Sequence, residues 1–135
     1  MRTAVTVWLV GGWILSAAAS ADTPLADCYR RAATRLEVKP CLEAKLSQAE
    51  AALRRAEAAT AREMEELAAV TGRDEASKAF EAAREAFSRH RQASCHWLRL
   101  RAEPGTGAGD IELDCRIRMT GARAAELERL SPSVP

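Results

Sequence analysis

The chain has 135 residues, 29% of them charged, and its 20 basic residues nearly balance its 19 acidic ones. A net charge of +1 provides no general attraction to DNA, RNA or anionic lipid, so it argues against a nucleic-acid-binding protein. Aromatic residues make up only 4% of the chain and alanine is abundant. This composition favours closely packed helices, because alanine loses almost no side-chain entropy in a helix.

Residues 1–21 have the pattern of a secretory signal peptide. Arg2 supplies a positive charge, residues 4–15 form a short apolar segment, and Ala19-Ser20-Ala21 fits an A-x-A cleavage site. The apolar segment is shorter than about 20 residues, the length that a membrane-spanning helix needs. We therefore expect a mature domain of residues 22–135 that is periplasmic or secreted and has no membrane span after cleavage.

Two helices are predicted in the first half of this domain. Apolar residues at mixed helical spacing predict a short helix within 25–38, which Pro40 is expected to end. From Leu42 the apolar residues recur in alternating steps of four and three, which predicts a long helix over about 42–69. Such a pattern is typical of a helix that packs along its whole length on a partner.

A second long helix is predicted after a turn at Gly72. Gly72 can adopt the left-handed conformation that closes a helix, and Thr71 or Asp74 can cap the next one. The second helix is expected over about 74–102, with its packing stripe at Ala76, Phe80, Ala83, Phe87, His90, Ser94 and Trp97. Because the turn is short, the two long helices must run antiparallel as a hairpin.

The remaining chain predicts a loop and a final helix. Residues 104–110 contain Pro104 and three glycines, so they are expected to form a flexible loop. Helical spacing returns over about 112–130. The predicted fold is a small, all-α, disulfide-stapled domain, with a long antiparallel helical hairpin, a short N-terminal helix and a C-terminal helix.

The four cysteines, Cys28, Cys41, Cys95 and Cys115, all belong to the mature domain, and in an exported protein an even number indicates disulfides. If the hairpin turns at Gly72, Cys41 lies about 12 Å along the helix from the position opposite Cys95. A disulfide needs Cα atoms within about 7 Å, so Cys41–Cys95 is disfavoured. Two connectivities remain: Cys28–Cys41 with Cys95–Cys115, or Cys28–Cys95 with Cys41–Cys115.

The second half of the chain resembles a known family. The pattern begins with two residues that carry flat rings, followed by an arginine and a cysteine: Phe87, His90, Arg91 and Cys95. It continues with a Gly-rich loop at residues 105–109, a second cysteine and a Thr-x-x-Arg-x-x-x-Leu helix, here Cys115, Thr120, Arg123 and Leu127. The pattern, with the spacing of Cys28 and Cys41, resembles the LprI-type, lysozyme-inhibitor-like domain of bacterial envelope proteins. The family usually has Trp in place of Phe87, and Tyr or Phe in place of His90.

The resemblance implies a helical, disulfide-stapled, exported domain, associated in some members with binding and inhibiting lysozyme. Together with the loop lengths, it favours Cys28–Cys41 and Cys95–Cys115. We find no pattern typical of a catalytic, cofactor-binding or metal site, so we expect a non-enzymatic protein without cofactors. His90 and His96 are six residues apart and lie on different helix faces.

The expected function is binding of a protein partner, for which the resemblance suggests lysozyme. The candidate partner-binding residues are Gly105, Thr106, Gly107 and Asp110 in the loop, together with Arg91. A loop held by a disulfide is pre-organised, which lowers the entropic cost of binding. For each there is a structural alternative: the loop as a simple connector, and Arg91 as an arginine that bonds carbonyls or a carboxylate near the disulfide. The alternative function is a structural or scaffolding hairpin protein of the envelope that assembles through its alanine-rich helix faces.

Overall fold

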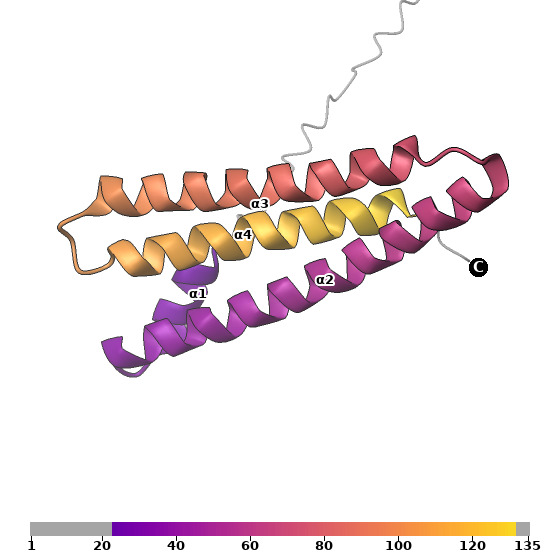
Figure 1. The fold of residues 1–135 in the computed structure, drawn as a ribbon. Helices are drawn as coiled ribbons and strands as arrows, with labels where there is room; N and C mark the ends of the chain where they lie inside the picture. Colours follow the sequence, from indigo (N-terminus) through magenta and orange to yellow (C-terminus); the bar gives the residue numbers. More distant parts are fainter. Residues whose placement is uncertain (1–22, 132–135) are drawn as a thin grey trace, which may run out of the picture.

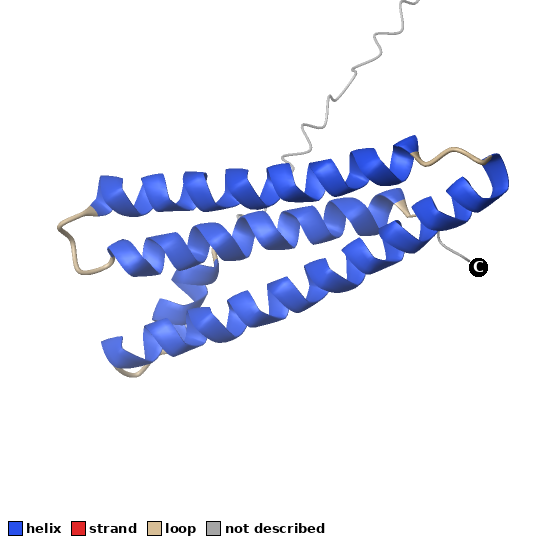
Figure 2. Ribbon diagram, viewed as in Figure 1, coloured by secondary structure: helices blue, strands red, loops and turns tan. Residues whose placement is uncertain are grey.

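The computed structural model describes residues 23–131, and the expected signal peptide, 1–21, lies outside these residues. The described chain consists of helices and loops (Figure 2). Its elements, in chain order, are α1 (Pro24–Arg31), the short 3-10 helix η1 (Arg35–Glu37), α2 (Val38–Thr71), α3 (Glu75–Ala102) and α4 (Ala108–Leu130). The fold is therefore all-α, with a long helical hairpin and shorter N-terminal and C-terminal helices, as predicted.

The hairpin turn is formed as the sequence indicates. Gly72 has φ 69° and ψ 15°, and its N–H donates to the carbonyl oxygen of Ala68 at 2.8 Å, which closes α2. The predicted side-chain cap of α3 is absent, because Asp74 precedes this helix without a capping hydrogen bond. The Asp74 carboxylate instead forms an ion pair with Lys78 at 2.8 Å, which lowers its pKa.

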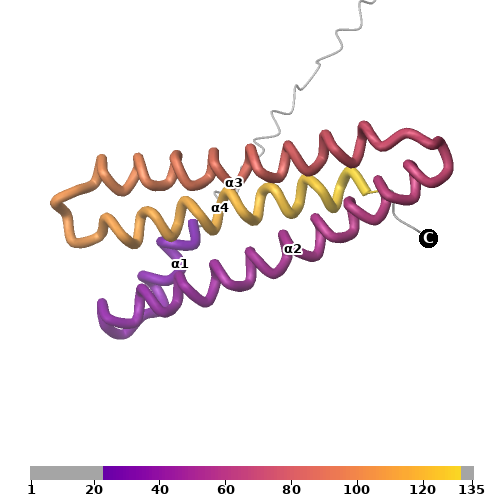
Figure 3. The backbone as a smooth tube through the Cα atoms, viewed as in Figure 1, coloured from indigo at the N-terminus to yellow at the C-terminus, as the bar shows by residue number. Residues whose placement is uncertain are grey.

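The spatial order of the long helices differs from their order in the chain. Figures 1 and 3 show α4 lying between α2 and α3, which are joined at one end and diverge toward the other. The two core clusters reflect this arrangement, because both contain residues of α2 and α4: Cys28, Val38, Leu42, Leu46 and Ile117 in one, and Leu53, Ala56, Ala124 and Leu127 in the other. The apolar stripe of α2 therefore packs mainly on α4, and α3 contributes Phe80 and Phe87 at the edge of the second cluster.

The N-terminal region differs from the prediction in two respects. The first helix ends at Arg31, and α2 begins at Val38 rather than near residue 42. Pro40 does not end a helix; it lies in the first turn of α2, where the missing N–H of proline costs nothing because that group has no intrahelical partner. α1 is fixed to α4 by Asp114, whose buried carboxylate accepts a hydrogen bond from the backbone N–H of Leu25 at 2.9 Å.

The start of α4 also differs from the prediction. The Gly-rich loop was expected over 104–110 and the helix from about 112, but α4 begins at Ala108. The loop is therefore restricted to residues 103–107, and Asp110 belongs to the first turn of α4. No helix among residues 23–131 is long and apolar enough to span a membrane.

Both disulfides connect cysteines that are near each other in the sequence. Cys28 is bonded to Cys41 and Cys95 to Cys115, with Cα–Cα distances of 5.8 and 5.5 Å. This is the connectivity that the loop lengths and the family resemblance favoured. The first disulfide attaches α1 to the start of α2, and the second joins α3 to α4.

Candidate protein-binding site

The loop between α3 and α4 is a tight and exposed corner. Gly105 and Thr106 are exposed, whereas Gly107 is half-buried directly before α4. The N–H of Gly105 donates to the carbonyl oxygen of Ala102 at 3.0 Å. A Cβ atom at Gly105 would lie 2.8 Å from that same oxygen, so the turn requires a residue without a side chain at this position.

Covalent and ionic contacts hold this corner on both sides. The Cys95–Cys115 disulfide joins the two helices that the loop connects. Arg99 of α3 donates to Glu103 at 3.2 Å and to Glu112 of α4 at 3.4 Å, and these hydrogen bonds raise the pKa of the guanidinium. The loop is therefore presented by a framework that limits its motion.

Asp110 has a structural role rather than a place in the loop. Its carboxylate accepts a hydrogen bond from the hydroxyl of Tyr29 at 3.1 Å and lies 3.8 Å from the guanidinium of Arg35. Partial burial, followed by the hydrogen bond to Asp110, raises the pKa of Tyr29. Arg35 also lies over the Tyr29 ring, at 5.2 Å from its centre. Asp110 thus fixes α1 and η1 to the beginning of α4.

Arg91 lies apart from the loop residues. It is half-buried on α3, and α3 continues for 11 further residues, about 16 Å, before the loop begins. Its guanidinium donates to the hydroxyl of Thr120 at 2.6 Å and lies 5.8 Å from the centre of the Phe87 ring. The structural interpretation of Arg91 predicted a carbonyl or carboxylate acceptor; the acceptor is a buried hydroxyl of α4.

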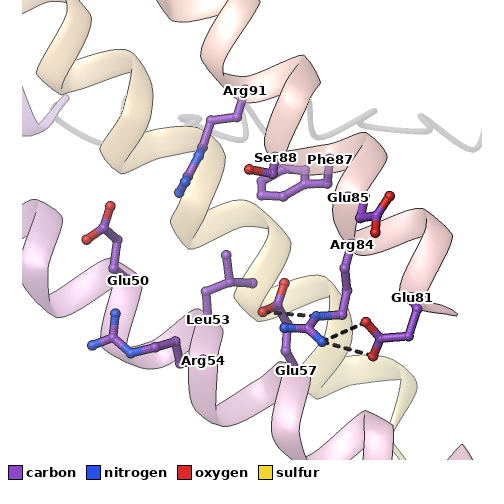
Figure 4. Close-up of a pocket in the computed structure, with 10 residues that line it drawn as sticks. All are labelled: Glu50, Leu53, Arg54, Glu57, Glu81, Arg84, Glu85, Phe87, Ser88 and Arg91. Carbon is purple, nitrogen blue, oxygen red and sulfur yellow. Dashed lines mark hydrogen bonds and ion pairs between the residues drawn. The ribbon is translucent and has the colours of Figure 1, made fainter.

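Arg91 also lines a groove of about 490 Å³ between α2 and α3 (Figure 4). Leu53 and Phe87 give the groove an apolar part, and charged side chains surround it. Arg84 donates from Nη1 to both carboxylate oxygens of Glu81, at 2.9 and 3.0 Å, and its Nε lies 3.4 Å from Glu57. The hydrogen bonds to Glu81 contribute most to the raised pKa of Arg84. Arg84 therefore pairs with two carboxylates, and this end of the groove keeps an excess of negative charge.

Trp97 is an exposed aromatic residue of α3, six residues before the loop. Its exposed fraction is 57%, that of Leu100 is 51%, and the guanidinium of Arg101 lies 5.4 Å from the centre of the Trp97 ring. Trp97 was expected on the packing stripe, and this expectation is wrong. The exposure of Trp97 follows from helix geometry, because Trp97 is two residues, about 200° around the helix, from Cys95, which is disulfide-bonded and fully buried.

His90 is also placed differently from the prediction. It was expected on the packing stripe but is exposed, and its Nδ1 lies 3.4 Å from the hydroxyl of Ser94. Within residues 23–131, no group of three His, Cys, Asp or Glu side chains is arranged to hold a metal ion. The exposed side chains on the last turns of α3 before the loop include an indole, a leucine and an arginine, those of Trp97, Leu100 and Arg101.

Comparison with known proteins gives one result. No curated protein and no solved structure matches the chain. The family model described as lysozyme inhibitor LprI matches residues 17–127. This match includes both disulfides, the α3–α4 loop and Trp97. Because it spans most of the sequence, the chain belongs to the lysozyme inhibitor LprI family.

Proposed function

We propose that the protein is an exported, non-enzymatic envelope protein that binds lysozyme and blocks its glycan-binding cleft. The contact surface is the α3–α4 end, defined as Trp97, Leu100, Arg101 and the loop 103–107. The observation that carries this assignment is the exposure of Trp97 and Leu100 beside a loop that a disulfide frames. Family membership supports an inhibitor rather than an enzyme.

The α3–α4 end has the properties of an energetic centre of an interface. Tryptophan and arginine are enriched among the residues that dominate binding energies, and Trp97 is already held beside Arg101 in the free protein. The disulfide and the Arg99 ion pairs restrict the loop before binding, so less conformational entropy is lost on association.

The charge of the partner's cleft suits this end. Most glycoside hydrolases cleave their substrate between two carboxyl groups, so the cleft is locally acidic. Arg101 can approach such carboxylates while the Trp97 ring covers the sugar-binding surface. The near-zero net charge of the whole chain gives no long-range attraction to a basic lysozyme, so affinity must come from contacts within the interface.

Export is supported by the cysteines. All four of them are in disulfides, and such bonds form and persist in oxidising compartments outside the cytoplasm. Together with the signal peptide expected at 1–21, this supports a periplasmic or secreted location for a mature domain of 22–135. Sequencing the N-terminus of protein recovered from cell envelopes tests this, since a chain still starting at Met1 would contradict it.

Inhibition is tested by titrating residues 22–135 into a lysozyme assay that measures lysis of a cell-wall suspension. We expect Trp97→Ala to weaken inhibition about tenfold or more, because truncation of a central tryptophan commonly costs that much binding energy. His96→Ala is the matched control: His96 is the exposed neighbour of Trp97 but points to another side of α3. Unchanged lysis at high concentrations of the wild-type protein would exclude the inhibitor function, and equal effects of the two variants would exclude the α3–α4 end.

The second candidate function is a structural role in the envelope without inhibition. Exposed alanines follow the outer side of α3 at positions 79, 82, 86 and 93. Small side chains allow another helix to approach closely, which favours assembly. Light scattering tests this alternative, since a strict monomer at every concentration would count against it.

A further inference from the structure

The exposed face of α2 carries charges that have no partner within the described chain. Most described arginines lie beside a carboxylate, but Arg54 and Arg55 form no hydrogen bond or ion pair with residues 23–131. The same holds for Glu65 and Glu66, about three turns further along. All four side chains are exposed. The opposite face of the helix packs on α4 through Leu53 and the second core cluster.

The spacing of these charges prevents them from pairing within one helix. Arg54 and Glu65 are 11 residues apart, as are Arg55 and Glu66, and 11 residues make about three turns, or 16 Å. Each arginine is therefore in line with its glutamate along the helix but out of its reach. Arg54 and Glu65 form one edge of the exposed face, and Arg55 and Glu66 form the other, about 100° away.

A second antiparallel copy of α2 would bring these charges together. If the two-fold axis passes near Thr60, residues 54 and 55 of one copy lie level with residues 65 and 66 of the other, to within one residue along the helix. Since a two-fold axis brings like edges together, Arg54 then meets the partner's Glu65 on one edge, and Arg55 meets the partner's Glu66 on the other. Both contacts occur twice, which gives four ion pairs.

The surface between these charges allows a close approach of the two helices. A shallow hollow on α2 is lined by Ala51, Arg54, Arg55, Ala58 and Arg62. The guanidinium of Arg62 donates to the carbonyl oxygen of Ala58 at 3.2 Å and so lies along the helix rather than extending outward. Alanines at the centre of the face leave room for a second backbone, as close helix packing requires.

From this self-complementarity we propose that the exposed face of α2 is an interface with a second copy of this chain. The two-fold arrangement requires a surface that complements itself, and the order of unpaired charges along α2 meets this requirement. The dimer does not depend on the proposed inhibitor function. It leaves the α3–α4 loop of each copy free, because this loop lies beyond the start of α2 (Figure 1), whereas the interface is centred near Thr60.

Sedimentation velocity of the oxidised domain, as a function of concentration and salt, tests the dimer. Exposed ion pairs are weak and screened by salt, so we expect a reversible dimer whose dissociation constant rises about tenfold or more from low to high salt. R54E/R55E and E65R/E66R should each be monomeric, because each variant places like charges opposite one another. An equimolar mixture of the two variants should form a heterodimer, because all four ion pairs are then restored.

R89E/R129E is the matched control, since it makes the same change in net charge at exposed arginines on α3 and α4. Circular dichroism should show equal helicity in all variants. The proposal is overturned if the wild type remains monomeric at low salt and high concentration, or if R54E/R55E dimerises like R89E/R129E. It is also overturned if the two charge-reversed variants remain separate when mixed.

Discussion

Removal of the Cys95–Cys115 disulfide should destabilise the domain mainly by releasing α3. The bond closes a loop with a sequence separation of 20, for which the chain-entropy model gives about 3 kcal/mol. The Cys28–Cys41 bond, with a separation of 13, gives nearly the same value. A domain of this size has a free energy of unfolding of about 5–15 kcal/mol, so either loss is a large fraction of the total.

The two disulfides should nevertheless differ in which part of the domain is destabilised when each is removed. Cys95 is the one buried residue that α3 contributes within the described chain, so this bond is the main buried attachment of α3 to α4. By contrast, α2 has five buried residues and is held independently of Cys41. Replacement of Cys95 and Cys115 by alanine should therefore loosen α3 before the rest of the domain unfolds.

Urea denaturation monitored by circular dichroism gives the overall magnitude. A loss of about 3 kcal/mol lowers the midpoint by about 2 M for an m-value of about 1.5 kcal/mol/M. Amide hydrogen exchange then locates the effect, with C28A/C41A as the control. The reasoning would be refuted by a midpoint shift below about 0.5 M, or by equal exchange in α3 of the two double variants.

Two further substitutions test the contribution of the buried Leu42 and of the ion pair between Asp27 and Lys45. Leu42→Ala should lower the free energy of unfolding by about 2–5 kcal/mol, because Leu42 is completely buried and its truncation leaves a cavity; a urea midpoint close to that of the wild type would contradict this. The hydrogen bond from Lys45 lowers the pKa of Asp27 to about 2 from 3.8, so protonation favours the unfolded chain. Stability should therefore fall as the pH drops from about 4 toward 2, and Asp27→Asn should make this fall shallower in urea titrations across that range.

The helical hairpin could be predicted from the sequence because its signals are local. The apolar stripe from Leu42 and the left-handed turn at Gly72 depend on neighbouring residues in the chain. The position of α4 could not be predicted in this way. The stripe of α2 shows that a partner helix exists, but Leu53 and Ala56 cannot indicate whether that partner is α3 or α4.

The misplacement of Trp97 has a geometric origin. A stripe with alternating steps of three and four residues has a mean period of 3.5, whereas the helix has 3.6 residues per turn, so the stripe drifts about 20° per heptad. Phe80 and Leu98 are 18 residues apart, five full turns, and both are half-buried on the same side of α3. Trp97 is one residue earlier and therefore about 100° away. Between Phe80 and Trp97 this drift amounts to about 50°, about half of the difference. The rest arises because the stripe also followed Ala76 and Ala83, which are exposed.

The central position of α4 has a consequence for the order in which the protein can fold. Its residues, Ala108–Leu130, leave the ribosome after those of α1, α2 and α3. Until they emerge, the apolar stripe of α2 has no surface to cover it, and α2 and α3 alone cannot complete either core cluster. The two core clusters should therefore not form until α4 has emerged, and up to that point the chain keeps the unfolded state that threading through a narrow channel requires.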